Sequence, residues 1–246
     1  MAAADPNIPM IELPAIAMAG VIFRYEDMIM SFDLAVAAGE FVAVIGPSGA
    51  GKTTLLALIA GFERADAGRI LISGADVTLL PPSARPVTTL FQEHNLFAHL
   101  DLAANVGLGV DPRLRLGEDD RARVSAALAR VGLAGFERRL PGQLSGGERQ
   151  RAALARSLVR DRPVLLLDEP FAALGPALRR DMLDLVRDIR RERRLTVLMV
   201  SHQPEDARYA ADRTAFVHAG RILKLAPTAD LFAAHDIAEL DAYLGS

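Results

Sequence analysis

The stretch Gly46-Pro47-Ser48-Gly49-Ala50-Gly51-Lys52-Thr53 constrains the fold more than any other part of this sequence. It follows an apolar run, Phe41–Ile45, and precedes a helical run, Thr54–Ala60. Its glycines let successive backbone N–H groups turn inward, and the helix after them adds its positive end. The stretch therefore predicts a phosphate-binding loop in an α/β protein, and these flanks disfavour a glycine-rich turn without function.

Each residue type in the loop has an expected task. Lys52 is expected to neutralise the terminal phosphates of a nucleotide, and the Thr53 hydroxyl to ligate Mg²⁺. We therefore expect ATP and Mg²⁺ as ligands. The nucleotide-binding residues predicted in this segment are Gly46, Pro47, Ser48, Gly49, Ala50, Gly51, Lys52, Thr53 and Thr54.

Two acids, Asp168 and Glu169, end a second apolar run that begins at Val164. Carboxylates at the carboxyl end of a buried strand lie where α/β sheets bind ligands. Asp168 is expected to hold Mg²⁺, and Glu169 to act catalytically by polarising the attacking water. The alternative is that one of them caps a helical turn before Phe171.

His202 follows a third apolar run, Leu195–Val200, and should emerge at the same sheet edge as Asp168. A single histidine is more often structural. Its place after a core strand favours a second catalytic role, in contact with the γ-phosphate.

The remaining pattern indicates one folded unit over residues 15–246, preceded by a flexible tail at residues 1–14. Between Gln92 and about Arg160 the strand pattern gives way to helical spacing, which predicts a helical subdomain at about 93–160 inserted into the α/β core. Another helix is predicted from Leu178 to Ile189. Strands are predicted at Val21–Tyr25, Phe41–Ile45, Arg69–Ile72, Val87–Phe91, Val164–Leu167, Thr196–Val200 and Thr214–Val217.

Composition excludes several classes of protein. The 246 residues are 51% hydrophobic, carry a net charge of −3 and include no cysteine. Disulfides and thiolate metal sites are thereby excluded, and the charge gives no case for a nucleic-acid partner. No apolar stretch is long enough to span a membrane, and the N-terminal residues do not resemble a secretory signal.

A further motif, LSGGERQ at Leu144–Gln150, closely resembles the LSGGQ signature of ABC ATPases. Ser145, Gly146 and Gly147 would present a hydroxyl and backbone N–H groups at the start of a helix. Ser145 and Glu148 also have the spacing of a capping box. The two interpretations are compatible, because the free N–H groups of the cap are the ones that would meet phosphate.

The resemblance implies a P-loop NTPase (RecA-like) core with an inserted helical subdomain and a small antiparallel β-subdomain. It implies that Ser145, Gly146, Gly147 and Glu148 bind the ATP held by the loop of a second copy, in a head-to-tail homodimer. Tyr25 would stack on adenine, although core packing is the alternative. Gln92 would touch Mg²⁺ and couple the site to membrane subunits, although a surface glutamine is the alternative. His202 matches the switch histidine of the family.

Three segments, Pro81–Val87, Leu90–His99 and Asn105–Gly109, look most like the ATP-binding subunits of bacterial thiamine importers. Membrane permease subunits and, indirectly, a periplasmic solute-binding protein are the implied partners. The implied location is peripheral, at the cytoplasmic face of the inner membrane. Importers of ferric iron, polyamines or sulfate are alternatives, disfavoured because only 44 residues follow His202.

Two positions depart from the family pattern. Glu148 stands where the signature has glutamine, and Gly175 stands where an aspartate normally bridges the dimer interface. One alternative function is a non-hydrolysing nucleotide sensor. Gly175 is the only residue that favours this alternative, and the intact Glu169 and His202 argue against it. A soluble ABC-type ATPase acting on nucleic acid would need coiled coils or zinc-binding segments, and this sequence has neither heptads nor cysteines.

Overall fold

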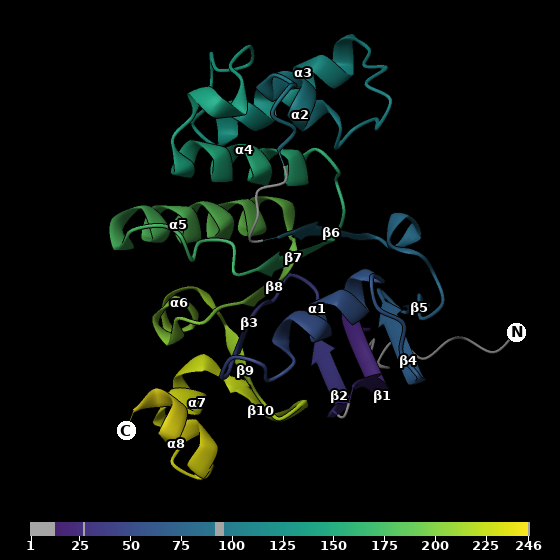
Figure 1. Ribbon diagram of the computed structural model, residues 1–246, viewed down its shortest axis with the longest axis vertical. Coiled ribbons are helices and arrows are strands. Elements are labelled where there is room, and N and C mark those ends of the chain that lie inside the picture. The colour runs from purple at the N-terminus through teal and green to yellow at the C-terminus, as the bar shows by residue number, and fades with distance from the viewer. Residues whose placement is uncertain (1–12, 27, 92–95, 246) are drawn as a thin grey trace, which may run out of the picture.

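A ten-stranded sheet runs through the computed structural model, which describes residues 13–26, 28–91 and 96–245 (Figure 1). The strand order is β5-β4-β1-β2-β10-β9-β3-β8-β7-β6. The strands are β1 (Ile16–Tyr25), β2 (Met28–Val36), β3 (Phe41–Ile45), β4 (Ala67–Ile72), β5 (Ala75–Asp76), β6 (Val87–Leu90), β7 (Val164–Asp168), β8 (Thr196–Val200), β9 (Arg213–His218) and β10 (Arg221–Pro227).

Eight α-helices accompany the strands in the described residues. They are α1 (Lys52–Ala60), α2 (Leu102–Gly107), α3 (Glu118–Arg130), α4 (Gly146–Leu158), α5 (Pro176–Arg193), α6 (Pro204–Ala210), α7 (Thr228–Ala233) and α8 (Ala238–Leu244). None of these helices combines the length and the apolar character that crossing a bilayer requires.

Strands β9, β3, β8, β7 and β6 are parallel and form the centre of the fold. Every residue of β3, β7 and β8 is buried, because helices cover both faces of this part of the sheet. Continuous burial on two faces explains why these strands are unbroken apolar runs in the sequence. Their carboxyl ends lie together and carry the loop, the two acids and His202.

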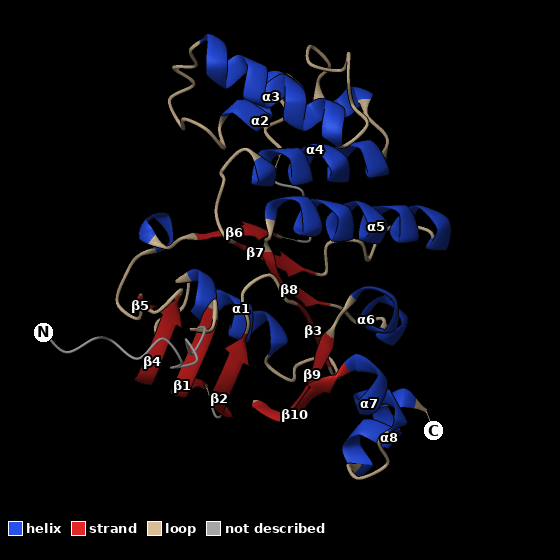
Figure 2. Ribbon diagram, turned by 180° about the vertical axis from the view of Figure 1, so that it is seen from behind, coloured by secondary structure: helices blue, strands red, loops and turns tan. Residues whose placement is uncertain are grey.

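Strands β1, β2, β4 and β5 pair in antiparallel fashion and stand side by side next to α1 (Figure 2). β2 was not predicted, because its buried residues alternate with exposed ones such as Asp33. β10 was not predicted either, since it is half exposed and carries Arg221 and Lys224. Strands with one solvated face have polar residues that interrupt the apolar run.

Helices α2, α3 and α4 lie between β6 and β7 in the chain and stack beyond α5 (Figure 1). The described residues between these two strands form no strand, so the predicted helical character of this stretch is confirmed for them. Val124, Leu128 and Val131 of the predicted apolar stripe are buried in one cluster with Leu154 of α4. Whether these helices behave as a separate subdomain stays a prediction.

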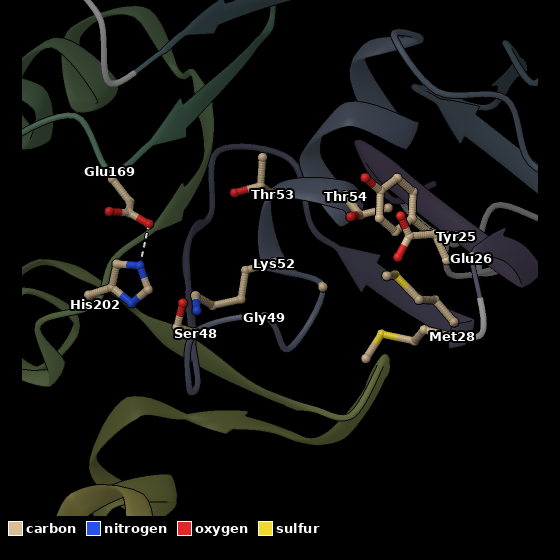
Figure 3. A pocket seen from close by; sticks show the side chains of 12 residues that line it. Tyr25, Glu26, Met28, Ser48, Gly49, Lys52, Thr53, Thr54, Glu169 and His202 are labelled. Carbon is tan, nitrogen blue, oxygen red and sulfur yellow. Dashed lines mark ion pairs between the residues drawn. The ribbon is translucent and has the colours of Figure 1, made fainter.

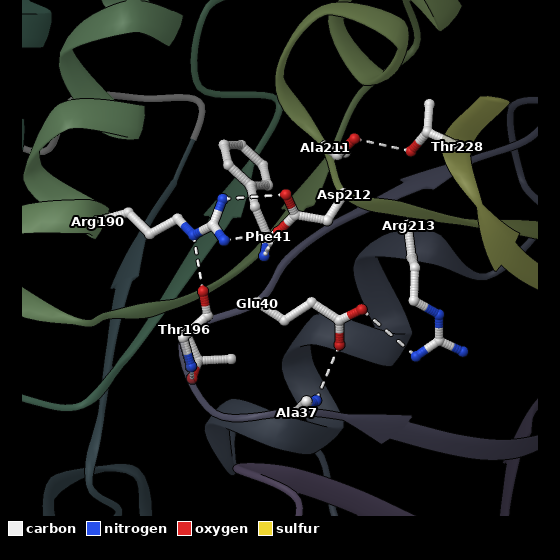
Figure 4. A network of polar contacts seen from close by, with 10 residues as sticks. Ala37, Glu40, Phe41, Arg190, Thr196, Ala211, Asp212, Arg213 and Thr228 are labelled. Carbon is white, nitrogen blue, oxygen red and sulfur yellow. Dashed lines mark hydrogen bonds and ion pairs between the residues drawn. The ribbon is translucent and has the colours of Figure 1, made fainter.

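A polar network pins the start of β3, opposite the end that carries the loop (Figure 4). Arg190 of α5 pairs with Asp212 at 2.7 Å, and an Asp212 carboxylate oxygen accepts the Phe41 N–H at 2.9 Å. Glu40 accepts the Ala37 N–H at 2.8 Å and faces Arg213 at 3.4 Å. The turn into β3 is therefore fixed at its end by Asp212 and at its start by Glu40, whose carboxylate is held in turn by Arg213.

Candidate nucleotide-binding site

The loop after β3 can be built only with glycine at its first position. Gly46 has φ of +148°, and a Cβ on it would lie 2.0 Å from the carbonyl oxygen of Val217 in β9. No side chain fits at that distance, so the neighbouring strand requires glycine here. Gly46 is therefore explained by the sheet as well as by the loop.

Lys52 folds its side chain back over the loop. Its ammonium group donates hydrogen bonds to the carbonyl oxygens of Gly46 at 2.8 Å and Pro47 at 2.7 Å, and the residue is only 4% exposed. Burial lowers the pKa of Lys52, while the nearby carboxylates of Glu169 and Asp168 act in the opposite direction. A buried cation beside inward-turned amides is suited to binding an anion.

Asp168 ends β7 next to the start of α1. The Thr53 hydroxyl donates a hydrogen bond to its Oδ1 at 3.3 Å. Burial raises the pKa of Asp168, and the bond from Thr53 works against that rise. The capping interpretation of the two acids is wrong, because their carboxylates contact Thr53 and His202, and the turn after Glu169 is closed by its backbone carbonyl, which accepts the Ala172 N–H at 3.3 Å.

The oxygen atoms of Thr53 and Asp168 fit a hard cation such as Mg²⁺. Within the described residues, no group of three or more His, Cys, Asp or Glu side chains could enclose a metal ion. Mg²⁺ commonly binds with nucleotides through one or two protein ligands together with phosphate oxygens and water, and Thr53 and Asp168 suit such a site.

Glu169 and His202 meet across the adjacent parallel strands β7 and β8. The Nε2 atom of His202 lies 2.5 Å from Oε1 of Glu169 (Figure 3). Glu169 has φ of +47°, in the left-handed region, and its N–H donates to the carbonyl of Val200 at 3.1 Å. This backbone turn directs the carboxylate toward the histidine, and strain at such a position is typical of functional sites.

A cavity of about 510 Å³ joins these side chains. Tyr25, Glu26 and Met28 lie at one end, Glu169 and His202 at the other, and Lys52 between them (Figure 3). The lining residues are Tyr25, Glu26, Met28, Met30, Ser48, Gly49, Gly51, Lys52, Thr53, Thr54, Glu169 and His202.

The cavity distinguishes between the alternative interpretations of Tyr25 and His202 that the sequence left open. Tyr25 is 58% exposed, so the core-packing interpretation of this residue is wrong. His202 lines the cavity and contacts an acid instead of packing in the core. An adenine contact by Tyr25 and a phosphate contact by His202 stay predictions.

The lining also includes Glu26, Met28 and Met30, which sequence reasoning missed. All three lie at the turn between β1 and β2, or in β2. The missed strand is the reason, because only its pairing with β1 brings the two methionines beside Tyr25. No local spacing in the sequence pointed to them.

The predicted signature residues form a helix cap at the start of α4. Ser145 Oγ accepts the Glu148 N–H at 3.3 Å, and a Glu148 carboxylate oxygen accepts the Ser145 N–H at 2.7 Å, which confirms the capping box. That second bond lowers the pKa of Glu148. Among the described residues that line the cavity, none belongs to this cap. One chain therefore does not bring the cap and the loop together.

The structure describes Gly175 but not Gln92. Gln92, predicted to touch both nucleotide and metal, lies outside the described residues. Gly175 has no atom within 4 Å of where a Cβ would stand, and its φ of −65° is open to any residue. Nothing in the fold therefore requires glycine in place of aspartate there.

Comparison with known proteins places this site in a family. The family model described as ABC transporter matches residues 29–172. The thiamine import ATP-binding protein ThiQ of Mesorhizobium japonicum is 56% identical over 226 residues, covering 92% of this chain and 89% of that protein. The ThiQ protein of Brucella suis is 54% identical over 230 residues, covering 94% and 95%.

Solved structures agree on the fold. The ADP conformation of an ATP-binding cassette of an ABC transporter has a TM-score of 0.85 at 20% identity, covering 95% of this chain and 100% of that chain. A dimeric cassette in a post-hydrolysis state, bound to ADP and phosphate, has a TM-score of 0.76 at 28% identity, covering 87% and 98%. The predicted P-loop NTPase fold is confirmed. With a family model across its centre and relatives more than half identical over nearly all its length, the chain belongs to the ABC transporter family.

Proposed function

We propose that this chain is the ATP-hydrolysing, energy-coupling subunit of an importer for thiamine. The observation that carries the proposal is the convergence of Lys52, Thr53, Glu169 and His202 on one cavity. Anion binding and water activation both need such groups within a short distance of one reacting phosphate.

In the proposed mechanism, the loop amides and Lys52 bind the phosphates, while Tyr25 stacks on the adenine at the opposite end of the cavity. Thr53 and Asp168 would hold Mg²⁺, together with Gln92. Bound Mg²⁺ supplies neutralisation of charge on the phosphate oxygens. Glu169 orients the attacking water and accepts its proton, and His202 steadies the carboxylate and the γ-phosphate.

The second half of each site would come from another copy of the chain. Ser145 and Gly146 are exposed at the start of α4, where the Ser145 hydroxyl and the Gly146 N–H would meet phosphate. A head-to-tail dimer would place this cap over the loop of its partner. The dimeric cassette at 28% identity supports the pairing of two copies.

A second cavity of about 510 Å³ is the proposed contact for a permease. Phe62 and Phe91 meet there edge to face, 5.4 Å between ring centroids, and remain 55% and 38% exposed. Exposed apolar rings beside a cavity are typical of protein interaction sites. Because Phe91 directly precedes Gln92, movement of a docked permease segment could reach the nucleotide site. The chain would then lie peripherally at the cytoplasmic face of the inner membrane.

We propose the solute from the relatives, because neither of the two cavities above is proposed to bind a solute. Three thiamine import ATP-binding proteins match this chain at 54–58% identity. In such an importer, the ATPase subunit would contact the permease, and a separate periplasmic protein would bind the solute.

The test is uptake in vesicles that contain the chain and the permease encoded beside its gene. Internal ATP with Mg²⁺ should drive accumulation of labelled thiamine when the periplasmic binding protein is added outside. The matched control is the same complex with Glu169→Gln. Hydrolysis of ATP without thiamine uptake would remove thiamine as the solute and leave the ATPase assignment standing.

A further inference from the structure

Helix α8 packs against β3 and β9, and the phosphate loop follows β3 directly. Leu240 of α8 is completely buried in a cluster with Ile45 of β3 and Phe216 of β9. Tyr243, one turn further on, lays its ring against Phe216 with 5.7 Å between the ring centroids. The helix is thus fixed against the two strands that flank the start of the phosphate loop.

The hydroxyl group of Tyr243 contacts the backbone of the site. It donates a hydrogen bond to the carbonyl oxygen of His202 at 3.4 Å. Burial raises the pKa of Tyr243, and the backbone N–H of Gly46 acts in the opposite direction. The side chain of Tyr243 therefore contacts the backbone of the histidine that contacts Glu169.

This contact matters because the backbone of His202 has few other restraints. Ser201 before it is held by the Val44 carbonyl at 3.1 Å and by Asp206 at 2.8 Å. In the described part of the chain, no other side chain bonds the backbone of His202. Since His202 leaves the end of β8, a shift of its carbonyl would move the imidazole away from Glu169.

We propose that Tyr243 is a positioning residue that sets the distance between His202 and Glu169. This inference rests on the proposed ATPase function. Tyr243 is not among the residues that line the cavity, and it acts through the backbone of His202. Loss of its hydroxyl should slow the chemical step and leave nucleotide binding unchanged.

The test compares Tyr243→Phe with Tyr209→Phe. Each variant loses one phenolic hydroxyl and keeps the ring, and the Tyr209 hydroxyl bonds Asp184 at 2.7 Å on α5, away from the cavity. Tyr243→Phe should lower kcat about three- to tenfold, with the KM for ATP within about twofold of the parent. Tyr209→Phe should leave both values unchanged.

A double-mutant cycle separates positioning from a general structural role. In a His202→Ala background, Tyr243→Phe should cause no further loss of kcat, because the group it positions is gone. An equal loss in both backgrounds, or no loss in either, would overturn the proposal.

A second readout does not need turnover. The imidazole resonances of His202, assigned by their absence in His202→Ala, should move in Tyr243→Phe and stay in place in Tyr209→Phe. Unmoved His202 resonances in Tyr243→Phe would refute the positioning role, whether or not the unmutated chain hydrolyses ATP. Absence of ATP hydrolysis by the unmutated chain would instead contradict the proposed function.

Discussion

The imidazole of His202 contacts the carboxylate of Glu169 at 2.5 Å, although the whole of α5 separates the two residues in the sequence. Adjacent parallel strands bring them together, since Asp168 of β7 is in register with Val200 of β8. The pair sits at the carboxyl end of the sheet, beside the loop that would hold the phosphates. Four predictions test this site.

Replacing Glu169 by glutamine should stop hydrolysis and keep nucleotide binding. The amide preserves the shape of the side chain and cannot accept the proton of the attacking water. We expect a loss of about a hundredfold or more in kcat and a long-lived ATP-bound dimer, measured by phosphate release and by size-exclusion chromatography. Hydrolysis at the parent rate would remove Glu169 as the base.

Replacing Lys52 by alanine should abolish measurable ATP binding. The substitution removes the buried ammonium group that faces the loop carbonyls, and charge-assisted contacts of this kind correspond to roughly ten- to a hundredfold each in affinity. Calorimetric titration with ATP measures the effect. Lys224→Ala is the control, since Lys224 is the only other lysine and pairs with Asp236 at 2.7 Å outside the cavity. Unchanged ATP affinity in Lys52→Ala would refute the assignment of the loop.

Replacing Asp168 by asparagine should stabilise the nucleotide-free protein at neutral pH, while weakening Mg²⁺ binding and so lowering the Mg²⁺-dependent activity. Burial raises the pKa of Asp168, so its ionised form is disfavoured in the folded state. That unfavourable contribution is complete above the raised pKa and vanishes below the usual value near 3.8. The gain from asparagine should therefore shrink as the pH falls.

Urea unfolding of the Asp168→Asn variant at several pH values, with and without MgATP, measures this effect. Asp236→Asn serves as the control, because Lys224 lowers the pKa of that exposed carboxyl and no gain is expected. A loss of stability in Asp168→Asn at neutral pH without nucleotide would contradict the prediction.

Replacing Gly175 by aspartate should be accommodated. The position has open space and an ordinary backbone conformation at the N-cap of α5, where aspartate is favoured over glycine by a few tenths of a kcal/mol. We expect a thermal midpoint raised by about one degree and turnover equal to or above that of the parent. Thermal unfolding and phosphate release provide both values, and a collapse of activity would mean that this loop meets its partner in another geometry.

The central site was predictable because its residues are tied to local backbone features. Gly46 to Thr53 must follow a strand and open a helix, and Asp168, Glu169 and His202 each end a strand buried on both faces. Such strands are continuous apolar runs, so their ends can be located from the sequence alone. The cap at Ser145 was predictable for the same reason, since a capping box involves residues three apart.

The amino-acid sequence by itself therefore determined the fold class, the loop, the acids and the family. Tertiary structure alone decided that Met28 and Met30 share a cavity with Tyr25, and that the Tyr243 hydroxyl bonds the carbonyl of His202. β2 and α8 are short or half-exposed elements whose polar residues hide their periodicity. Their positions depend on packing against distant strands, and no local spacing encodes such contacts.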